Sequence, residues 1–204
     1  MKFFSILVIT LLLVFIAIQL FALKSHYGIE THYYQIQKQF HNFEIRRYDK
    51  ALFSSVKLST DNFKDASSLG FSVLAGYIFG NNYRNEKIAM TSPVMMSLED
   101  SISMFFLVPK KIKMDKLPSP NNENIEFKYQ PVKTVAVISF GGWANAKKIE
   151  NYKIKLLAIL DEKSLSHNNQ FFFLGYNAPY EVFNRKNEII VELNNFSNYN
   201  LKTY

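Results

Sequence analysis

The sequence predicts an α+β domain in which antiparallel strands form one curved sheet or barrel and helices pack outside it. Two segments, 61–79 and 145–160, carry apolar residues at helical spacing, whereas the segments around them are rich in β-branched and aromatic residues. Another segment, residues 3–23, is apolar throughout and precedes this pattern. Groups of strands on either side of single helices favour the α+β class.

Composition places the chain among globular proteins and excludes several kinds of site. Of the 204 residues, 48% are hydrophobic and 16% aromatic, which excludes wholesale disorder. The net charge is +7, but no run of consecutive Lys or Arg is longer than two, so we expect no nucleic-acid partner. The chain has no cysteine, which excludes disulfides, thiolate metal sites and cysteine nucleophiles.

Residues 3–23 (FFSILVITLLLVFIAIQLFAL) predict a transmembrane helix that acts as a signal-anchor. Only Ser5, Thr10 and Gln19 are polar, and no residue of the segment is charged. A helix of this length spans roughly 30 Å, which is the thickness of the hydrocarbon core of a bilayer. A helix buried in a protein core is rarely apolar on all sides over so many turns.

The alternative interpretation of this segment is a cleaved signal peptide. Such a peptide usually has an apolar region of about 7 to 15 residues followed by a small-x-small cleavage site. The apolar segment is longer than that, and the best candidate site, around Ala22, has Leu20 where a small residue is expected. Lys2 favours a cytoplasmic N-terminus and Lys24 argues weakly against it. We therefore expect a single-pass membrane protein with its domain on the non-cytoplasmic side.

The predicted organisation is an anchor over residues 1–24, a juxtamembrane linker over 25–40 and one domain over 41–204. The linker is polar and aromatic without a clear period, and it runs into a first strand. Its two histidines, His26 and His32, are expected to be solvated.

The first half of the domain contains a helix between two groups of strands. The helix, 61–79, is predicted to begin with Asp61 as N-cap and to stop at Gly80. Strands are predicted for the segments 43–58, which holds one or two, 87–97, which Pro93 interrupts, and 102–108. A loop rich in proline, asparagine and lysine follows over 109–123.

The second half repeats this order and indicates an internal duplication. Its helix is 145–160, and its strands are predicted at 124–140, 170–176 and 188–193. Residues 43–46 (FEIR) align with residues 125–128 (IEFK) at an offset of 82, and Pro93 aligns with Pro179 at an offset of 86. Each half is then a β-helix-β-β unit.

Catalytic and metal-binding patterns are absent from the sequence. It contains no G-x-S-x-G and no H-E-x-x-H, and its glycines form neither a phosphate loop nor a dinucleotide fingerprint. No pair of histidines has metal-site spacing among His26, His32, His41 and His167. The sequence therefore does not predict an enzyme, and no catalytic residue is assigned.

Methionines and aromatic residues gather in the first half of the domain. Met90, Met95, Met96 and Met104 accompany Phe105, Phe106 and the helical residues Phe71, Leu74, Tyr77 and Phe79. Soft, adaptable side chains of this kind suit a large planar apolar ligand. The alternative is that they form an ordinary hydrophobic core.

Five strings occur in a fixed order between residues 43 and 191. They are FEIRRY (43–48), FSVLAGYIFGNN (71–82), KIAMTSPV (87–94), SFGGW (139–143) and GYNAPYEVFNRKNEIIV (175–191). Together they resemble the SOUL haem-binding protein family. The resemblance implies a distorted antiparallel β-barrel of two similar halves flanked by two helices. It also implies an exposed apolar pocket for haem or a related tetrapyrrole, formed by the first helix of the domain and the loop before its last strand.

Carried over to this sequence, the resemblance implies six pocket residues: Leu74, Tyr77 and Ile78 on the helix, and Pro179, Arg185 and Lys186 in the loop. The two bases are suited to pair with propionate groups, although a solvated turn is the alternative for them. No axial ligand of the iron follows from the resemblance, and His41 stays unassigned.

The resulting hypothesis is a membrane-anchored haem or tetrapyrrole binder that acts as a carrier or buffer. Two alternatives stay open. One is a binding module for another amphipathic small molecule or a lipid, and the other is a protein-interaction module without haem.

Overall fold

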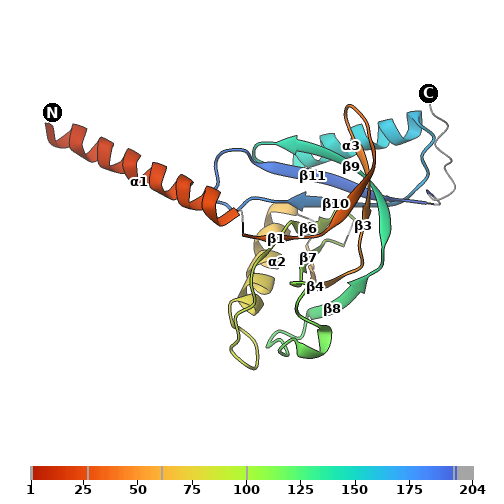
Figure 1. The fold of residues 1–204 in the computed structure, drawn as a ribbon, viewed down its shortest axis with the longest axis horizontal. Helices are drawn as coiled ribbons and strands as arrows, with labels where there is room; N and C mark the ends of the chain where they lie inside the picture. The colour runs from red at the N-terminus through yellow and green to blue at the C-terminus, as the bar shows by residue number, and fades with distance from the viewer. Residues whose placement is uncertain (1, 27, 61, 100, 195, 197–204) are drawn as a thin grey trace.

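The computed structural model describes residues 2–26, 28–60, 62–99, 101–194 and 196, and within the first range it describes the side chains of residues 3–19 only (Figure 1). The helices are α1 (Lys2–His26), α2 (Phe63–Ile78) and α3 (Ala146–Glu162), with a short 3-10 turn at Met114–Lys116. The strands are β1 (Glu30–Thr31), β2 (Tyr34–Gln39), β3 (Glu44–Tyr48), β4 (Ala51–Lys57), β5 (Thr91–Ser92), β6 (Val94–Ser97), β7 (Ser103–Leu107), β8 (Ile125–Gln130), β9 (Lys133–Gly141), β10 (His167–Gly175) and β11 (Lys186–Leu193).

Nine of these strands form one antiparallel sheet in the order β2-β3-β9-β11-β10-β6-β7-β4-β8. The sheet is curled into a half-barrel, and α2 and α3 pack on its outer side (Figure 1). β1 and β5 form a separate parallel pair. The predicted α+β class is confirmed, with an incompletely closed sheet in place of a barrel.

The strand order confirms the internal duplication. When β2 is left aside, the strand order is symmetric about its centre. The first strand of each half pairs with the second strand of the other half: β3 pairs with β9, and β8 pairs with β4. The aligned strings 43–46 and 125–128 fall at the starts of β3 and β8, which occupy equivalent outer positions. Each half has two strands before its helix, so the unit is ββαββ and not the predicted β-helix-β-β. The alignment of Pro93 with Pro179 was wrong, since Pro93 precedes β6 and Pro179 precedes β11, whereas β6 corresponds to β10.

Helices α2 and α3 each have an asparagine as N-cap, and each buries one stripe of apolar side chains against the sheet. The side chain of Asn62 accepts hydrogen bonds from the backbone N–H groups of Lys64 and Asp65 at 2.9 and 3.2 Å, so it is the N-cap of α2. Asp61, the predicted N-cap, lies outside the described residues. Asn145 caps α3 in the same way through Lys148 N at 2.9 Å.

The hydrophobic core has an outer and an inner part. The outer side of the sheet packs against α3 through residues such as Leu156 and Leu160 and against α2 through Leu74. The inner side of the curl is filled by a third cluster that includes Phe53, Val137 and Ile190. A cavity of about 20 Å³ lies at this inner cluster, and it has room for no more than a water molecule.

The segment predicted to be a linker, 25–40, contains β1 and β2. β2 is the edge strand beside β3, with Tyr34 opposite Tyr48 in the register. Side chains of residues 20–27, including His26 and the region of Ala22, lie outside the description.

Helix α1 covers the segment that the sequence predicts as an anchor. Within the described part of the chain, no helix combines the length and the apolar character that crossing a membrane requires. The transmembrane helix expected from the sequence is therefore not supported by the structure.

Candidate functional site

A groove of about 680 Å³ lies on the outer side of the sheet, between α2 and the segment leading into α3. We call it the α2 groove. Its walls and floor are formed by Phe63, Ser67, Ser68, Phe71, Ser72, Ala75, Val94, Met96, Met104, Trp143, Ala144, Phe173, Gly175, Asn177, Pro179, Arg185 and Asn187. Its volume falls within the range of about 300 to 1,000 Å³ that is typical of small-molecule sites.

The floor of the groove lies where the two halves of the sheet meet. β10 and β6 are the central pair of the symmetric strand order, and Phe173 is opposite Met96 in their register. On β7, Met104 is in turn opposite Met96. Side chains alternate between the two faces along each strand. These three belong to the face that packs against α2 and α3, whereas the residues next to them in the strands face the inner cluster. The duplication thus places large, adaptable apolar side chains under a groove between two helices.

One wall of the groove is the loop over residues 177–185, which connects β10 to β11. Asn177 holds this loop together: its amide donates to Glu181 Oε2 at 2.6 Å, and its oxygen accepts from Lys186 N at 2.7 Å. Glu181 also accepts from Ala178 N at 3.2 Å and is only 8% exposed. The wall therefore has a defined conformation fixed by its own side chains.

Arg185 is the one cationic side chain that lines the groove. Its guanidinium stacks on Trp143 at 3.9 Å from the ring centroid, and its Nη1 donates to the carbonyl of Ala178 at 2.9 Å and to that of Glu181. Its Nε is buried and has no hydrogen-bond partner, the sole such side-chain nitrogen or oxygen in the described chain. Burial lowers the pKa of Arg185, while Glu181 opposes that effect, and a guanidinium stays charged in proteins. The groove therefore contains a fixed cation, which suits an anionic group of a ligand.

Two of the six residues that the resemblance implied line this groove, namely Pro179 and Arg185. Leu74, Tyr77 and Ile78 are at most 5% exposed and pack inward against the sheet. The hydroxyl of Tyr77 donates to the carbonyl of Pro118 at 2.9 Å, and burial raises the pKa of Tyr77 to about 12. The three helical residues are therefore core residues in the structure.

Lys186, the sixth residue, points to the opposite face of the sheet. Its Nζ lies 3.0 Å from Glu188 Oε1 and 4.3 Å from the ring centroid of Tyr176. It follows Arg185 directly, but successive residues entering a strand alternate between faces. Arg185 therefore lines the α2 groove, whereas Lys186 contacts Glu188 on the other face of the sheet.

The groove face of α2 carries Phe71, which the sequence pattern had indicated as suited to a planar apolar ligand, and also serines, which it had not. Ser68, Phe71, Ser72 and Ala75 lie at helical spacing along the groove. Trp143, which ends the SFGGW string, was quoted for the resemblance but not assigned to the pocket. Its position as the only tryptophan, next to the Gly141-Gly142 turn, was the available signal.

A buried charge network lies on the inner face of the sheet. Arg46 donates to both carboxylate oxygens of Glu188 at 3.0 Å, and these residues are 2% and 0% exposed. Glu188 also accepts from Tyr176 at 2.6 Å and from Ser139 at 3.1 Å. Burial alone would raise the pKa of Glu188, but Arg46, Lys186 and Tyr176 together hold it below its ordinary value. Each oxygen of the carboxylate is satisfied, so this network has the form of a structural ion pair.

Comparison with known proteins places this architecture in a family. The family model described as SOUL heme-binding protein matches residues 29–192. The chain belongs to the SOUL heme-binding protein family. The match includes β1 and β2, so the family domain begins within the segment predicted as a linker.

Two relatives of this SOUL chain are named for haem. Heme-binding protein 2 of Homo sapiens is 29% identical over 157 residues, which cover 72% of this chain and 76% of the relative. Heme-binding protein 1 of Xenopus laevis is 27% identical over 161 residues, covering 75% and 84%.

Solved structures support the fold of this SOUL domain. The EcmrR C-terminal domain aligns with a TM-score of 0.59 at 12% identity, covering 79% of this chain and 98% of that domain. A hydrolase from Listeria innocua aligns with a TM-score of 0.55 at 5% identity, covering 78% and 94%. At such identities the likeness concerns the fold alone.

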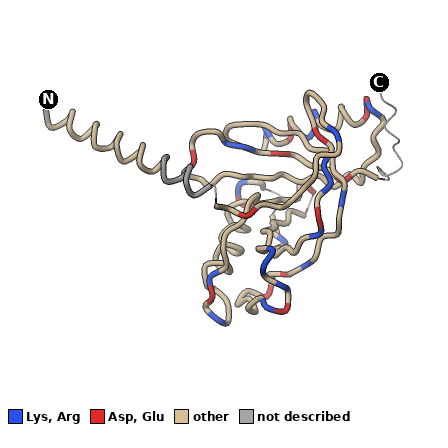
Figure 2. Tube along the Cα trace, in the orientation of Figure 1, with Lys and Arg blue, Asp and Glu red and all other residues tan. Residues whose placement is uncertain are grey.

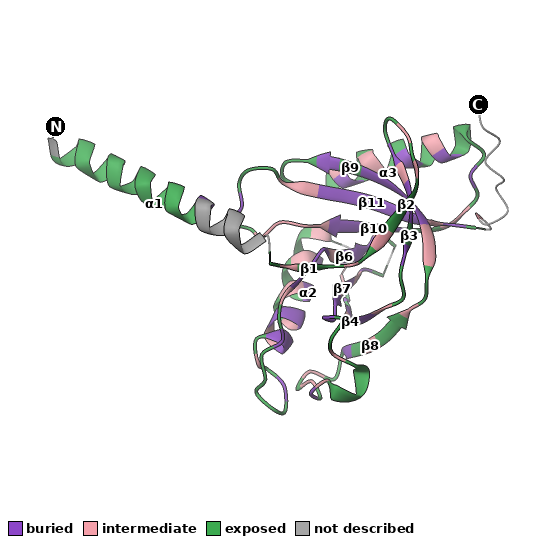
Figure 3. Ribbon diagram, in the orientation of Figure 1, coloured by how far each residue is buried: buried purple, intermediate pink, exposed green. Residues whose placement is uncertain are grey.

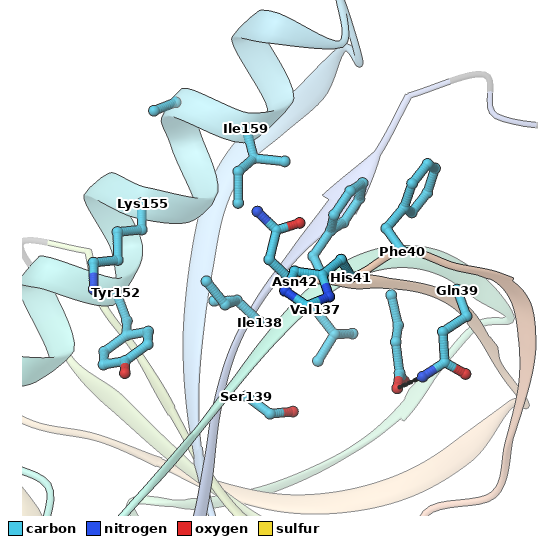
Figure 4. A pocket seen from close by; sticks show the side chains of 13 residues that line it. Gln39, Phe40, His41, Asn42, Val137, Ile138, Ser139, Tyr152, Lys155 and Ile159 are labelled. Atoms are coloured by element: carbon cyan, nitrogen blue, oxygen red, sulfur yellow. Dashed lines mark hydrogen bonds between the residues drawn. The ribbon is translucent and has the colours of Figure 1, made fainter.

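The histidines with described side chains lie outside the α2 groove. His41 lines a separate depression of about 590 Å³ between α3 and the β2–β3 hairpin, together with Ser139, Tyr152 and Lys155 (Figure 4). The walls of that depression mix polar and apolar side chains, and Gln39 donates to Glu44 across its rim at 3.1 Å. Within the described residues, no group of three or more His, Cys, Asp or Glu side chains is placed to hold a metal ion.

Proposed function

We propose that this SOUL protein binds haem or a related tetrapyrrole in the α2 groove and acts as a carrier or buffer. The carrying observation is Arg185, whose buried Nε has no partner in a groove that is otherwise floored by apolar side chains. Membership of the family and the printed names of the relatives support a tetrapyrrole as the ligand.

The residues of the groove fit such a ligand by their chemistry. Phe71, Met96 and Phe173 offer the apolar and polarisable surface that suits a flat macrocycle. Arg185 offers a charge-assisted donor to a propionate, and Ser68 and Ser72 offer hydroxyls at the rim. Bound haem would supply an iron centre, and this chain would contribute binding and shielding from water. The relatives are named as binding proteins, and we propose the same class, and not an enzyme, for this chain.

A second candidate is a different amphipathic small molecule or a lipid with an acidic headgroup. It is favoured by the absence of a described histidine from the groove, since haem iron is commonly held by histidine. Native mass spectrometry of the protein extracted from its own source separates the two, because it gives the mass of the ligand that accompanies the chain.

Haemin titration of the full chain in detergent micelles tests the proposal. Wild-type protein is expected to give a saturable Soret shift with one haemin bound per chain. Arg185→Met removes the cation of the groove, so we expect the affinity to fall about 10- to 100-fold, as for loss of a charge-assisted hydrogen bond.

Lys186→Met is the matched control for this titration. Lys186 is the adjacent base, but it faces Glu188 on the other side of the sheet, so its replacement is expected to leave haemin affinity within about twofold. The absence of a saturable shift in the wild-type protein would remove the proposal. Equal losses for both variants would show that long-range charge, and not the groove, governs binding.

We also propose that α1 holds this protein at a membrane. The support is the exposure of its apolar side chains from Phe3 to Ile18, which the domain does not cover (Figure 3). The single-pass topology with a non-cytoplasmic domain stays a prediction from the sequence. Flotation with lipid vesicles, described below, tests the membrane contact.

A further inference from the structure

Exposed apolar side chains gather on the outer surface of the 177–185 loop. Tyr180, Val182 and Phe183 are 50%, 41% and 60% exposed, and Trp143, which is in contact with the loop through Arg185, is 54% exposed. Single exposed apolar residues are ordinary on protein surfaces, whereas a contiguous group marks an interaction site. This group borders the α2 groove, because Trp143 also lines it.

Helix α1 is attached to this loop by specific contacts. Gln19, one of the few polar residues of the apolar segment, is only 9% exposed. Its amide donates to the carbonyl of Tyr180 at 3.0 Å, and its oxygen accepts from Val182 N at 3.3 Å. Phe15 meets Phe183 edge to face, with ring centroids 6.5 Å apart. The apolar surface of the loop therefore continues onto α1, which projects away from the domain at this place (Figure 1).

The distribution of apolar side chains around α1 indicates whether protein or lipid surrounds the helix. Residues 6–9 and 11–16 are consecutive, and each apolar member is at least 41% exposed, so they cover every side of the helix. A protein partner would need one apolar stripe with polar residues opposite. Residues 3–19 of α1 include no charged residue (Figure 2), and lipid is the surrounding that contacts a helix on all sides.

We propose that α1 and the loop form one lipid-facing surface, made of α1, Trp143, Tyr180, Val182 and Phe183, which rests on a bilayer with the α2 groove opening beside the headgroups. Tryptophan and tyrosine favour the interfacial level of a membrane, where an apolar ring and a polar tip are both accommodated. The inference rests on the proposed membrane contact of α1 and extends it to the loop that forms a wall of the ligand site.

The sole tryptophan of the chain makes this surface directly measurable, since Trp143 belongs to it. Full-length protein is reconstituted with vesicles of phosphatidylcholine and phosphatidylglycerol, with bromine placed either near the headgroup or at the end of the acyl chain. We expect Trp143 emission to be quenched, and more strongly by bromine near the headgroup. The control carries Trp143→Phe and Tyr83→Trp, because Tyr83 is 77% exposed and lies outside the proposed surface, in the segment after α2, where its backbone N–H donates to the carbonyl of Ser119. Its emission is expected to be unaffected by bromine.

Flotation of the same samples distinguishes the possible failures. Phe183→Asp is expected to keep flotation, which α1 provides, and to reduce quenching of Trp143. Flotation without quenching would overturn the lipid-facing loop while leaving the membrane contact of α1 intact. Absence of flotation, or a stable complex with a second protein in its place, would overturn both. The haemin titration in micelles is independent of these outcomes, so loss of the haem proposal and loss of this one are separable.

Discussion

Replacing Arg46 by methionine is expected to lower the free energy of unfolding by about 3 to 5 kcal/mol at pH 7. Arg46 is bound through both oxygens of Glu188 and stacks on Tyr34 at 4.3 Å from the ring centroid. Methionine fills similar volume but leaves the carboxylate of Glu188, which is fully buried, without its main counter-charge. The loss is large compared with the total stability of about 5 to 15 kcal/mol for a domain. Equilibrium unfolding in urea, followed by circular dichroism, measures it.

Arg47→Met is the matched control for this substitution. Arg47 is the next residue on β3 but points to solvent, so its replacement is expected to change stability by less than about 0.5 kcal/mol. The double variant Arg46→Met with Glu188→Leu is expected to recover much of the loss, because the buried charge is then removed with its partner. A double variant less stable than Arg46→Met would show that Glu188 stabilises the fold through its other partners, Tyr176, Ser139 and Lys186, even without Arg46.

The effect of Arg46→Met is expected to shrink as the pH falls. In the wild-type protein the pKa of Glu188 lies below its ordinary value of 4.5, so this group stabilises the fold above that pH and loses its contribution as the pH falls through the folded value. Burial raises the pKa of Glu188 and Arg46 lowers it, so the pKa of Glu188 is expected to rise when Arg46 is removed. Protonation then relieves the buried charge, and the difference between wild type and variant narrows from pH 7 to about pH 5. A constant difference over this range would assign the loss to packing.

Local patterns in the sequence predicted the helices α2 and α3, but they did not predict which strands pair with each other. The helical spacing in 61–79 and 145–160 located α2 and α3, since amphipathic periodicity is a local property. Which strands become neighbours is not local: β3 pairs with β9 and Arg46 meets Glu188 across 142 positions of sequence. Alternation puts Arg46 and Tyr48 on one face of β3, but only the curl of the sheet makes that face interior.

The groove lies at the two elements that the resemblance implied for the pocket, and two of the six implied residues line it. The resemblance led to α2 and to the loop before β11, where Pro179 and Arg185 line the groove. The three helix residues lie beneath α2 because the most apolar stripe of α2 packs against the sheet, and the groove is bordered by the neighbouring stripe with Ser68 and Ser72. Hydrophobicity identifies the face that is buried most deeply, whereas a ligand face on a surface groove is mixed.

A glutamate at Leu74 is expected to abolish folding, although the resemblance implied Leu74 as a ligand contact. Leu74 is 0% exposed within the outer cluster beneath α2. Removal of its side chain alone, in Leu74→Ala, is expected to cost about 2 to 5 kcal/mol. An unpaired charge in the same place adds several kcal/mol to this cost. The total loss of unfolding free energy for Leu74→Glu is then comparable with the whole stability of a typical domain, about 5 to 15 kcal/mol. Thermal unfolding measured by circular dichroism gives the comparison.

Ser72→Glu separates the core stripe of α2 from its groove stripe. Ser72 is exposed, two positions before Leu74, and lines the groove, so this variant is expected to keep the wild-type melting temperature within about 2 °C. Its carboxylate would repel a propionate, and haemin binding is expected to weaken by about tenfold. The reverse outcome is equally informative: if Leu74→Ala weakened haemin binding without loss of stability, the ligand would lie beneath α2, because a side chain that only packs the core changes affinity through folding and not through contact.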